Sequence, residues 1–280
     1  MNRLILLSPL LMGFLTGCPP PPASLTHPDQ AMPGAGGGND DSTQFACVLQ
    51  VKVSSIEVPV GTASGSEEIW SYLDEERTKA FHSATLGRNG MRVGLADVSV
   101  WPDLARILTK MTGKKLAEQS FSALPSQPFP IELRSNLPSQ TIFTSYADRT
   151  LSGADYPPGD NLLTLSITLD ENDSSRMIVT ALPQIRSTQR NTDIVHEGSG
   201  LVFVDQPATY SFHPATFQFT MKDKDIVVIG PGAESRRPTS IGYHFLLQEK
   251  RSMLCETVLV LSINIIKVPL RNTAAGEPRR

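Results

Sequence analysis

The chain has 280 residues and a formal net charge of −3, with 40% hydrophobic and 19% charged residues. This balance is typical of a globular protein with a buried core, and it excludes a largely disordered chain. The length allows one large domain or two small ones. The mild acidity argues against a nucleic-acid partner, because no Lys/Arg cluster is present to neutralise a row of phosphates.

The first segment of the chain has the parts of a secretory signal. Arg3 is its only charge, an apolar block runs over residues 4–15, and two small residues precede Cys18. The block is too short to cross a bilayer as a mature helix. The motif LTGC ending at Cys18 resembles the lipobox of bacterial lipoproteins, which implies a signal peptide 1–17 and a diacylglycerol on the cysteine. The alternative is an ordinary secreted protein that has a cysteine at that position.

The next segment has almost nothing to bury. Residues 19–44 are Pro-rich and then Gly-rich, which predicts that 18–44 form a lipid-bearing, disordered tether. No aspartate follows Cys18, and the same lipoprotein resemblance then favours the outer membrane, facing the periplasm, over the inner membrane. The polar residues 271–280 are expected to be a disordered tail.

Folded structure is expected to start at Phe45, where apolar and polar residues begin to alternate as in a strand. The alternation changes phase at 54–55, which predicts a bulge or a new strand. A capping box of Ser64 and Glu67 predicts a helix over 66–80.

A turn at Asn89-Gly90 and a strand MRVGLADV are expected after that helix. Pro102 suits the first turn of a second helix, whose apolar stripe includes Leu104, Ile107 and Leu108 and which ends at Gly113. Two helices with two strands predict a small α+β subdomain over 45–115.

The rest of the chain, 116–270, reads as a β-rich domain with almost no helix, so the fold class is α+β and mostly β, with a sandwich or a curved sheet. The last strand is apolar on both faces at its start, which predicts a central or covered position. Candidate strands are 117–123, 129–134, 140–146, 162–169, 176–182, 194–204, 216–221, 225–230, 241–248 and 256–268.

The three cysteines divide by place. If Cys18 carries lipid, Cys47 in the first strand and Cys255 at the start of the last strand remain. Two thiols in an exported protein commonly pair, so a disulfide between Cys47 and Cys255 is expected, with two buried free thiols as the alternative.

Catalytic and cofactor signals are weak throughout, and we expect no enzyme activity, no cofactor and no metal. In HEGSG, Ser199 lacks the spacing of a nucleophile elbow, and a polar turn is favoured over a catalytic role with His196. No histidine has a second ligand at a zinc spacing, and His244 is expected to be structural. The acidic cluster 170–173 reads as a solvated hairpin tip, since it lacks the glycine and distal glutamate of a calcium loop.

One stretch resembles a known family. Residues 160–268 resemble a reduced form of the carboxyl-terminal β domain of the secretins, the outer-membrane channels of bacterial secretion systems. LTLSITL with MIVTALPQI resemble the paired early strands, FQFTMKDKDIVVIGPG the strand-turn-strand, and SIGYHFL with ETVLVLSINII the late turn and final strand. Pro231 interrupts the double glycine of that family. The resemblance implies a homo-oligomer at the outer membrane.

Three functions follow from these observations. The first is a lipid-anchored, non-enzymatic structural or interaction protein of the bacterial cell envelope, with an envelope protein or a second copy as partner. The second is a secretin-like oligomeric channel subunit of a secretion system. The third is an envelope hydrolase, for which the sequence offers no convergent catalytic set.

Overall fold

The computed structural model describes residues 45–78, 80–112, 116, 118–173, 175–197 and 200–269. Most of the described chain is β-strand with a few short helices, which confirms the α+β, mostly β class. Five of the sequence predictions lie outside the described residues: the signal 1–17, Cys18 with its tether to residue 44, the helix end at Gly113, Ser199 and the tail 271–280.

The described strands form three antiparallel sheets. Their bounds are β1 (Phe45–Pro59), β2 (Met91–Ala96), β3 (Glu118–Ala123), β4 (Phe129–Leu137), β5 (Gln140–Ser145), β6 (Leu151–Tyr156), β7 (Gly159–Leu169), β8 (Arg176–Glu197), β9 (Gly200–Ser211), β10 (Phe217–Lys222), β11 (Ile226–Pro231), β12 (Leu247–Lys250) and β13 (Met253–Pro269). Sheet I has the order β2-β11-β13-β1-β3, with β12 also on β13; sheet II has the order β10-β8-β7-β4, with β9 also on β8; β5 and β6 pair alone. The helices are α1 (Glu67–Trp70), α2 (Ala80–Arg88), α3 (Trp101–Thr112) and α4 (Ile241–Leu246).

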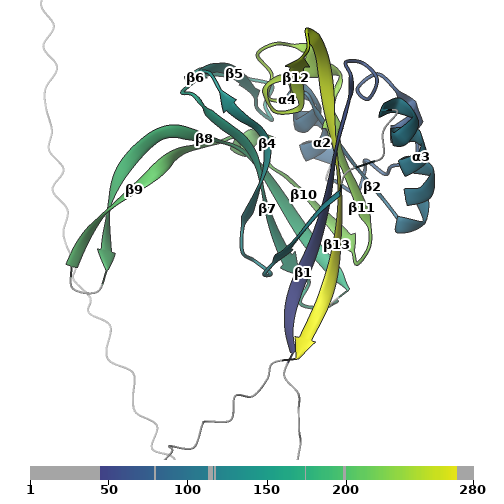
Figure 1. Ribbon diagram of the computed structural model, residues 1–280, viewed down its shortest axis with the longest axis horizontal. Helices are drawn as coiled ribbons and strands as arrows, with labels where there is room; N and C mark the ends of the chain where they lie inside the picture. Colours follow the sequence, from purple (N-terminus) through teal and green to yellow (C-terminus); the bar gives the residue numbers. More distant parts are fainter. Residues whose placement is uncertain are drawn as a thin grey trace, which may run out of the picture. The chain divides into compact units, whose positions relative to one another are not determined.

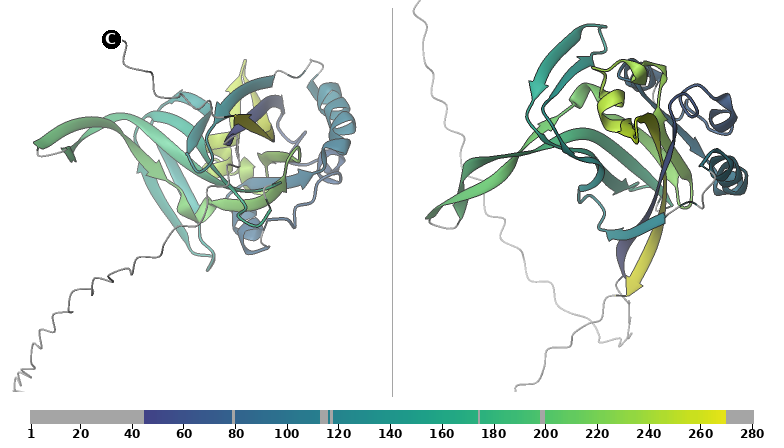
Figure 2. Two further views of the ribbon diagram at one scale, coloured as in Figure 1. Left: turned by 90° about the horizontal axis from the view of Figure 1, so that it is seen from below. Right: turned by 45° about the horizontal axis from the view of Figure 1, so that its top comes forward.

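Sheets I and II pack face to face, and α1 and α3 lie on the other face of sheet I (Figures 1 and 2). The core between the sheets includes Val51 of β1 and Leu163 of β7. A second core, between sheet I and the helices, includes Val228 of β11 and Leu108 of α3. The predicted sandwich is therefore present, and one of its sheets is buried on both faces.

Burial on both faces explains the phase change in β1. Residues 45–59 pair with β13 in one unbroken register, so neither a bulge nor a new strand occurs. Leu49 and Val51 point into the core between the sheets, whereas Ile56 and Val58 point into the core under the helices. The apolar side of the strand changes because the covering layer changes, and the pleat itself stays regular.

β13 is central, as its sequence predicts. It lies between β11 and β1, and every residue from Cys255 to Leu261 is buried. The predicted boundary at residue 115 does not separate the sheets, because β1 and β2 lie before it and pair with β13 and β11 after it. Early and late strands can bury their apolar faces only in this joint sheet.

The first predicted helix, over 66–80, is wrong. α1 ends at Trp70, and the chain then turns to reach β2, where Asp74 and Leu95 exchange two backbone hydrogen bonds of 2.7 and 3.0 Å. The N-cap is Ser66, whose Oγ accepts a hydrogen bond from Glu68 N at 3.2 Å. The unpaired edge of β2 offers the chain more hydrogen bonds than a longer helix would. The second predicted helix is confirmed as α3.

Two features of the late chain also differ from expectation. Residues 241–248 begin as helix α4 because Ser240 Oγ accepts a hydrogen bond from Tyr243 N at 3.1 Å and so caps the helix. The stretch FQFTMKDKDIVVIGPG is a strand, a turn and a strand as expected, but its two strands, β10 and β11, belong to different sheets. The turn between them carries the chain from sheet II to sheet I.

The predicted disulfide between Cys47 and Cys255 is wrong, and both are free thiols. Their strands do pair, but in antiparallel fashion, so Cys47 faces Lys267 and Cys255 faces Pro59. The two cysteines lie about 40 Å apart along the β1–β13 pair, since a strand rises about 3.4 Å per residue. A disulfide requires Cα atoms less than about 7 Å apart.

The predicted turn at Asn89-Gly90 connects three parts of the fold. Asn89 is fully buried, and its Nδ2 donates to the carbonyl oxygens of Thr85 and Ser145 at 2.9 Å each. Gly90 has a φ of +81°, which favours glycine. The Asn89 carbonyl accepts a hydrogen bond from Gly242 N at 2.8 Å, which brings the start of α4 onto the turn.

This contact makes a strong prediction for Gly242. A Cβ added there would lie 2.0 Å from the Gly90 carbonyl oxygen, whereas a Cβ at Gly87 in α2 would meet nothing within 4 Å. We expect Gly242→Ala to lower the free energy of unfolding by more than about 3 kcal/mol and Gly87→Ala to raise it by about 0.5 kcal/mol. Urea unfolding of both variants checks this, and a neutral Gly242→Ala would contradict the close packing.

Candidate functional site

β8 and β9 extend beyond sheet II as a two-stranded ribbon, defined here as residues 188–197 and 200–207. β10 pairs with β8 only up to Ala181 and β7 only up to Ser187, whereas β9 follows β8 to the pair Glu197–Gly200. Both figures show this ribbon curving away from the packed sheets (Figures 1 and 2). Its length is about 25–30 Å at the usual rise per residue.

The ribbon bends away from sheet II at a bulge. Three residues of β8, from Ser187 to Gln189, lie opposite the single residue Ala208 of β9. A bulge of this kind bends its strand and increases the local twist. The base is fixed to the preceding loop, because Thr188 donates its N–H and its Oγ1–H to the carbonyl oxygen of Pro158, at 3.0 and 3.2 Å.

An ion pair also holds the base of the ribbon. Arg186 Nη2 lies 2.8 Å from Asp160 Oδ2 in β7 and 3.5 Å from Glu132 Oε2 in β4. The hydrogen bond from Arg186, followed by one from the backbone N–H of Asn136, lowers the pKa of Asp160. Three strands of sheet II therefore fix the direction in which the ribbon leaves.

The far end of the ribbon is apolar and exposed. Phe203 is 70% exposed and faces Ile194, which is 59% exposed, across the strand pair. Leu201, which is 59% exposed, lies on the same face as Phe203, and Val202, 39% exposed, lies on the opposite face because side chains alternate along a strand. The part nearer the bulge is polar, with a hydrogen bond of 2.6 Å from Thr192 Oγ1 to Asp205 Oδ1. Large apolar side chains gathered at one place in this way mark interaction sites.

Both edges of the ribbon lack a strand partner within the described chain. Past Ser187 the outer edge of β8 is open, and β9 pairs only with β8. A two-stranded ribbon is only marginally stable alone in water, and open edges are sites where further strands add. The ribbon therefore combines edge hydrogen-bonding groups with apolar side chains, which are the two requirements of a β-sheet interface.

The other sequence candidates have structural places. His196 lies in β8 and pairs with Leu201 in register, while Ser199 is outside the described residues. His244 is in α4, where its ring Nε2 donates to the Thr141 carbonyl at 3.1 Å, and burial lowers its pKa. The acidic cluster forms the β7–β8 turn, in which Asp173 accepts from Ser175 N at 3.0 Å.

Within the part of the chain that the structure describes, no group of three or more His, Cys, Asp or Glu side chains is placed to hold a metal ion. Among the described helices, none has the length and hydropathy to cross a bilayer.

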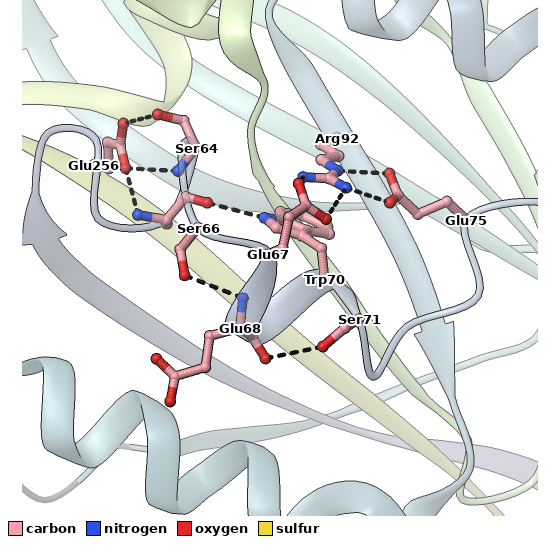
Figure 3. Close-up of polar contacts among 10 residues, drawn as sticks. Ser64, Ser66, Glu67, Glu68, Trp70, Ser71, Glu75, Arg92 and Glu256 are labelled. Atoms are coloured by element: carbon pink, nitrogen blue, oxygen red, sulfur yellow. Dashed lines mark hydrogen bonds and ion pairs between the residues drawn. The ribbon is translucent and has the colours of Figure 1, made fainter.

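Sequence reasoning missed a buried carboxylate, Glu256 of β13 (Figure 3). Its Oε1 accepts from Gly61 N at 2.7 Å and its Oε2 from Ala63 N at 2.9 Å and Ser64 N at 3.0 Å, while Ser64 Oγ–H adds a fourth hydrogen bond. Four donors compensate for burying the charge. The carboxylate thus fixes the loop that leads into α1.

From that loop a chain of contacts reaches the edge of sheet I. Trp70 Nε1 donates to the Ala63 carbonyl at 2.9 Å, and the Arg92 guanidinium lies 4.5 Å from the Trp70 ring. Arg92 makes two hydrogen bonds to Glu75, at 2.6 and 2.7 Å, and two longer ones to Glu67. Burial opposes its charge, but these carboxylates raise the pKa of Arg92 above its usual value. Through Arg92, these contacts tie Glu67 of α1 to the edge strand β2.

The sequence does contain signals for the buried carboxylate and for the β8–β9 ribbon. Glu256 is a lone charge at the head of the apolar run TVLVL, and a carboxylate at such a position requires hydrogen-bond donors. The polar segment HEGSG separates two runs that form β8 and β9, although 194–204 was expected to be one strand.

No family model matches the sequence, and no curated protein matches it. Among solved structures, the chain is similar to the V. cholerae type IV competence pilus secretin PilQ, with 9% identity over 79% of this chain and 60% of that one, at a TM-score of 0.21. The InvG secretin domain β-barrel from the Salmonella SPI-1 injectisome has 7% identity over 82% of this chain and 64% of that one, at a TM-score of 0.21. The Klebsiella pneumoniae type II secretion system outer membrane complex has 11% identity over 81% of this chain and 40% of that one, at a TM-score of 0.21.

The chain therefore spans less than two thirds of each of these structures. The first two are secretins, the family that residues 160–268 resemble. The expected pairing of LTLSITL with MIVTALPQI is present as β7 and β8. At TM-scores near 0.2 this likeness does not establish membership of the family.

The buried carboxylate supports a stability prediction. Glu256→Gln would replace one accepting oxygen by an amide that faces backbone N–H groups, so we expect a loss of about 2–4 kcal/mol in the free energy of unfolding. Glu57→Gln, at an exposed pair with Lys250, is the matched control and should cost less than about 1 kcal/mol. Urea unfolding measures both, and equal effects would contradict the anchoring role.

Proposed function

We propose that this chain is a non-enzymatic structural protein of the bacterial cell envelope, held at the outer membrane by a lipid on Cys18, which assembles with further copies of itself through the β8–β9 ribbon. The observation that carries the proposal is the ribbon itself, with two open edges and an exposed apolar end. Edge pairing between copies would satisfy backbone groups and bury Phe203 and its neighbours together.

The geometry of the ribbon suits self-addition. β8 and β9 are antiparallel, so the open edge of β9 in one copy and the open edge of β8 in the next would again pair in antiparallel fashion. Such head-to-tail contacts form rings when the rotation closes, and closure leaves no strand edge unpaired.

A secretin-like channel subunit is the second candidate function. It is favoured by the same ribbon, because a ring of ribbons is a closed barrel with two strands from each copy. A ring with a central pore in negative-stain images would select this candidate over a scaffold without a pore.

Self-assembly is tested by shortening the ribbon. Joining Arg190 to Pro207 through Asn-Gly removes the exposed end, and none of the removed residues whose burial the structure describes belongs to either hydrophobic core. We expect the full-length protein, extracted in a mild detergent, to have the mass of an oligomer, and the shortened variant to have the mass of a monomer with an unchanged melting temperature. Light scattering after size-exclusion chromatography measures the mass.

Single substitutions sharpen this test. Phe203→Asp should weaken association at least about tenfold, because a charge would replace a central apolar contact. Leu151→Asp is the matched control, since Leu151 is 52% exposed in β6, outside the ribbon, and should leave the mass unchanged. A monomeric wild type, or a shortened variant that still assembles, would overturn the proposal.

The lipid anchor has its own test. We expect Cys18→Ala to abolish incorporation of labelled palmitate and to move the protein from the membrane to the soluble fraction, whereas Cys47→Ala should do neither. Mass analysis of the mature wild type should find an acylated amino terminus at residue 18. An unmodified amino terminus elsewhere would contradict lipid attachment.

A further inference from the structure

A groove of about 330 Å³ opens on the helix-covered face of sheet I, beside the start of α3. It lies apart from the ribbon and has no part in the proposed assembly. Its lining comes from β1, β3, β11, β13, the turn between β10 and β11, and the residues at the start of α3.

One part of the groove is apolar. Ile226 and Val260, which are 2% and 4% exposed, belong to the core under the helices and reach the groove at its margin. Trp101 is partly buried against the same core, and Val98 beside it is 45% exposed. A flat apolar ring or a short chain would find contacts here that water does not provide.

The other part is polar, and the strand register places its groups on one face. Ser54 faces Val260, and Lys52 faces Ser262, across the β1–β13 pair. Residues directly opposite in an antiparallel pair point to the same side of the sheet. Hydroxyl donors therefore lie next to the apolar margin, as in sites that orient a small ligand.

The two lysines of the groove differ in whether a carboxylate pairs with them. Lys52 is neutralised by Glu118, with its Nζ 3.3 Å from Oε1. Lys224 has no ion pair with a carboxylate of the described chain, and the neighbouring Asp225 pairs with Arg77 at 3.1 Å. The groove therefore carries a net positive charge beside an apolar surface.

We propose that this groove binds a small organic anion, with an apolar ring or short chain against Trp101 and Val260 and a carboxylate or phosphate toward Lys224. The volume is at the lower end for ligand sites, which suits an anion with a single ring or a short acyl chain. The site is independent of the ribbon, so it should be present in the monomeric, shortened variant as well.

Two matched probes test the proposal on the full-length protein in a neutral detergent. 4-Iodobenzoate and 4-iodobenzamide share a ring and a heavy atom that quenches tryptophan fluorescence, and only the first is charged. The chain has two tryptophans, of which Trp70 is 2% exposed. We expect saturable quenching by iodobenzoate that disappears in Trp101→Phe.

The charge requirement is tested by Lys224→Gln, with Lys222→Gln in the same turn as the matched control. Lys224→Gln should weaken iodobenzoate about threefold and leave iodobenzamide unchanged, as expected for one exposed ion pair. Lys222→Gln should change neither. Equal binding of the two probes, saturable quenching that persists in Trp101→Phe, or no effect of Lys224→Gln would overturn the proposal.

Discussion

The pairing of the first strand with the last is the constraint on which the rest of the fold depends. β1 and β13 run side by side over the whole 15 residues of β1 in one register. This pair forms the middle of sheet I, against which sheet II packs on one face and the helices on the other. Because the partners come from opposite ends of the folded chain, the fold closes only when the chain is nearly complete, and its contacts are predominantly non-local.

The β8–β9 ribbon differs from the β1–β13 pair because no other layer covers it. Sheet II supplies neighbours to β8 only up to Ser187, and the bulge after that residue turns the strands away from the core. The polar side chains near the bulge are well solvated, whereas Phe203 and Ile194 at the far end expose apolar surface to water. An exposed apolar surface of this kind is a cost to an isolated subunit and is useful when another molecule covers it.

Sequence patterns predicted the parts of the fold that local chemistry determines. The stripe of Leu104, Ile107 and Leu108 predicted α3, and the turn at Asn89-Gly90 predicted the entry to β2. The double-sided apolar run of β13 predicted its central position. Each depends on periodicity or on a turn residue within a short window.

Short sequence windows could not predict the register of the strands or which strands pair. Cys47 and Cys255 lie in paired strands, yet the antiparallel direction places them at opposite ends of the pair. β10 and β11 are neighbours in sequence and still belong to different sheets, because each buries its apolar side chains against a distant strand. The ribbon begins where β8 loses β7 as a neighbour, at the pair of Gly159 with Ser187, and a short sequence window within β8 contains no information about that position.

The register of β1 with β13 also places Phe45 opposite Pro269, so the described chain enters and leaves the fold at one point. Ends that lie this close can be joined by a short linker without crossing the core, and new ends can be opened at an exposed turn. The topology therefore permits a circular permutant that begins at the β5–β6 turn and keeps both cores intact. In such a molecule the central strands would be joined as a hairpin, and their pairing would become a local event.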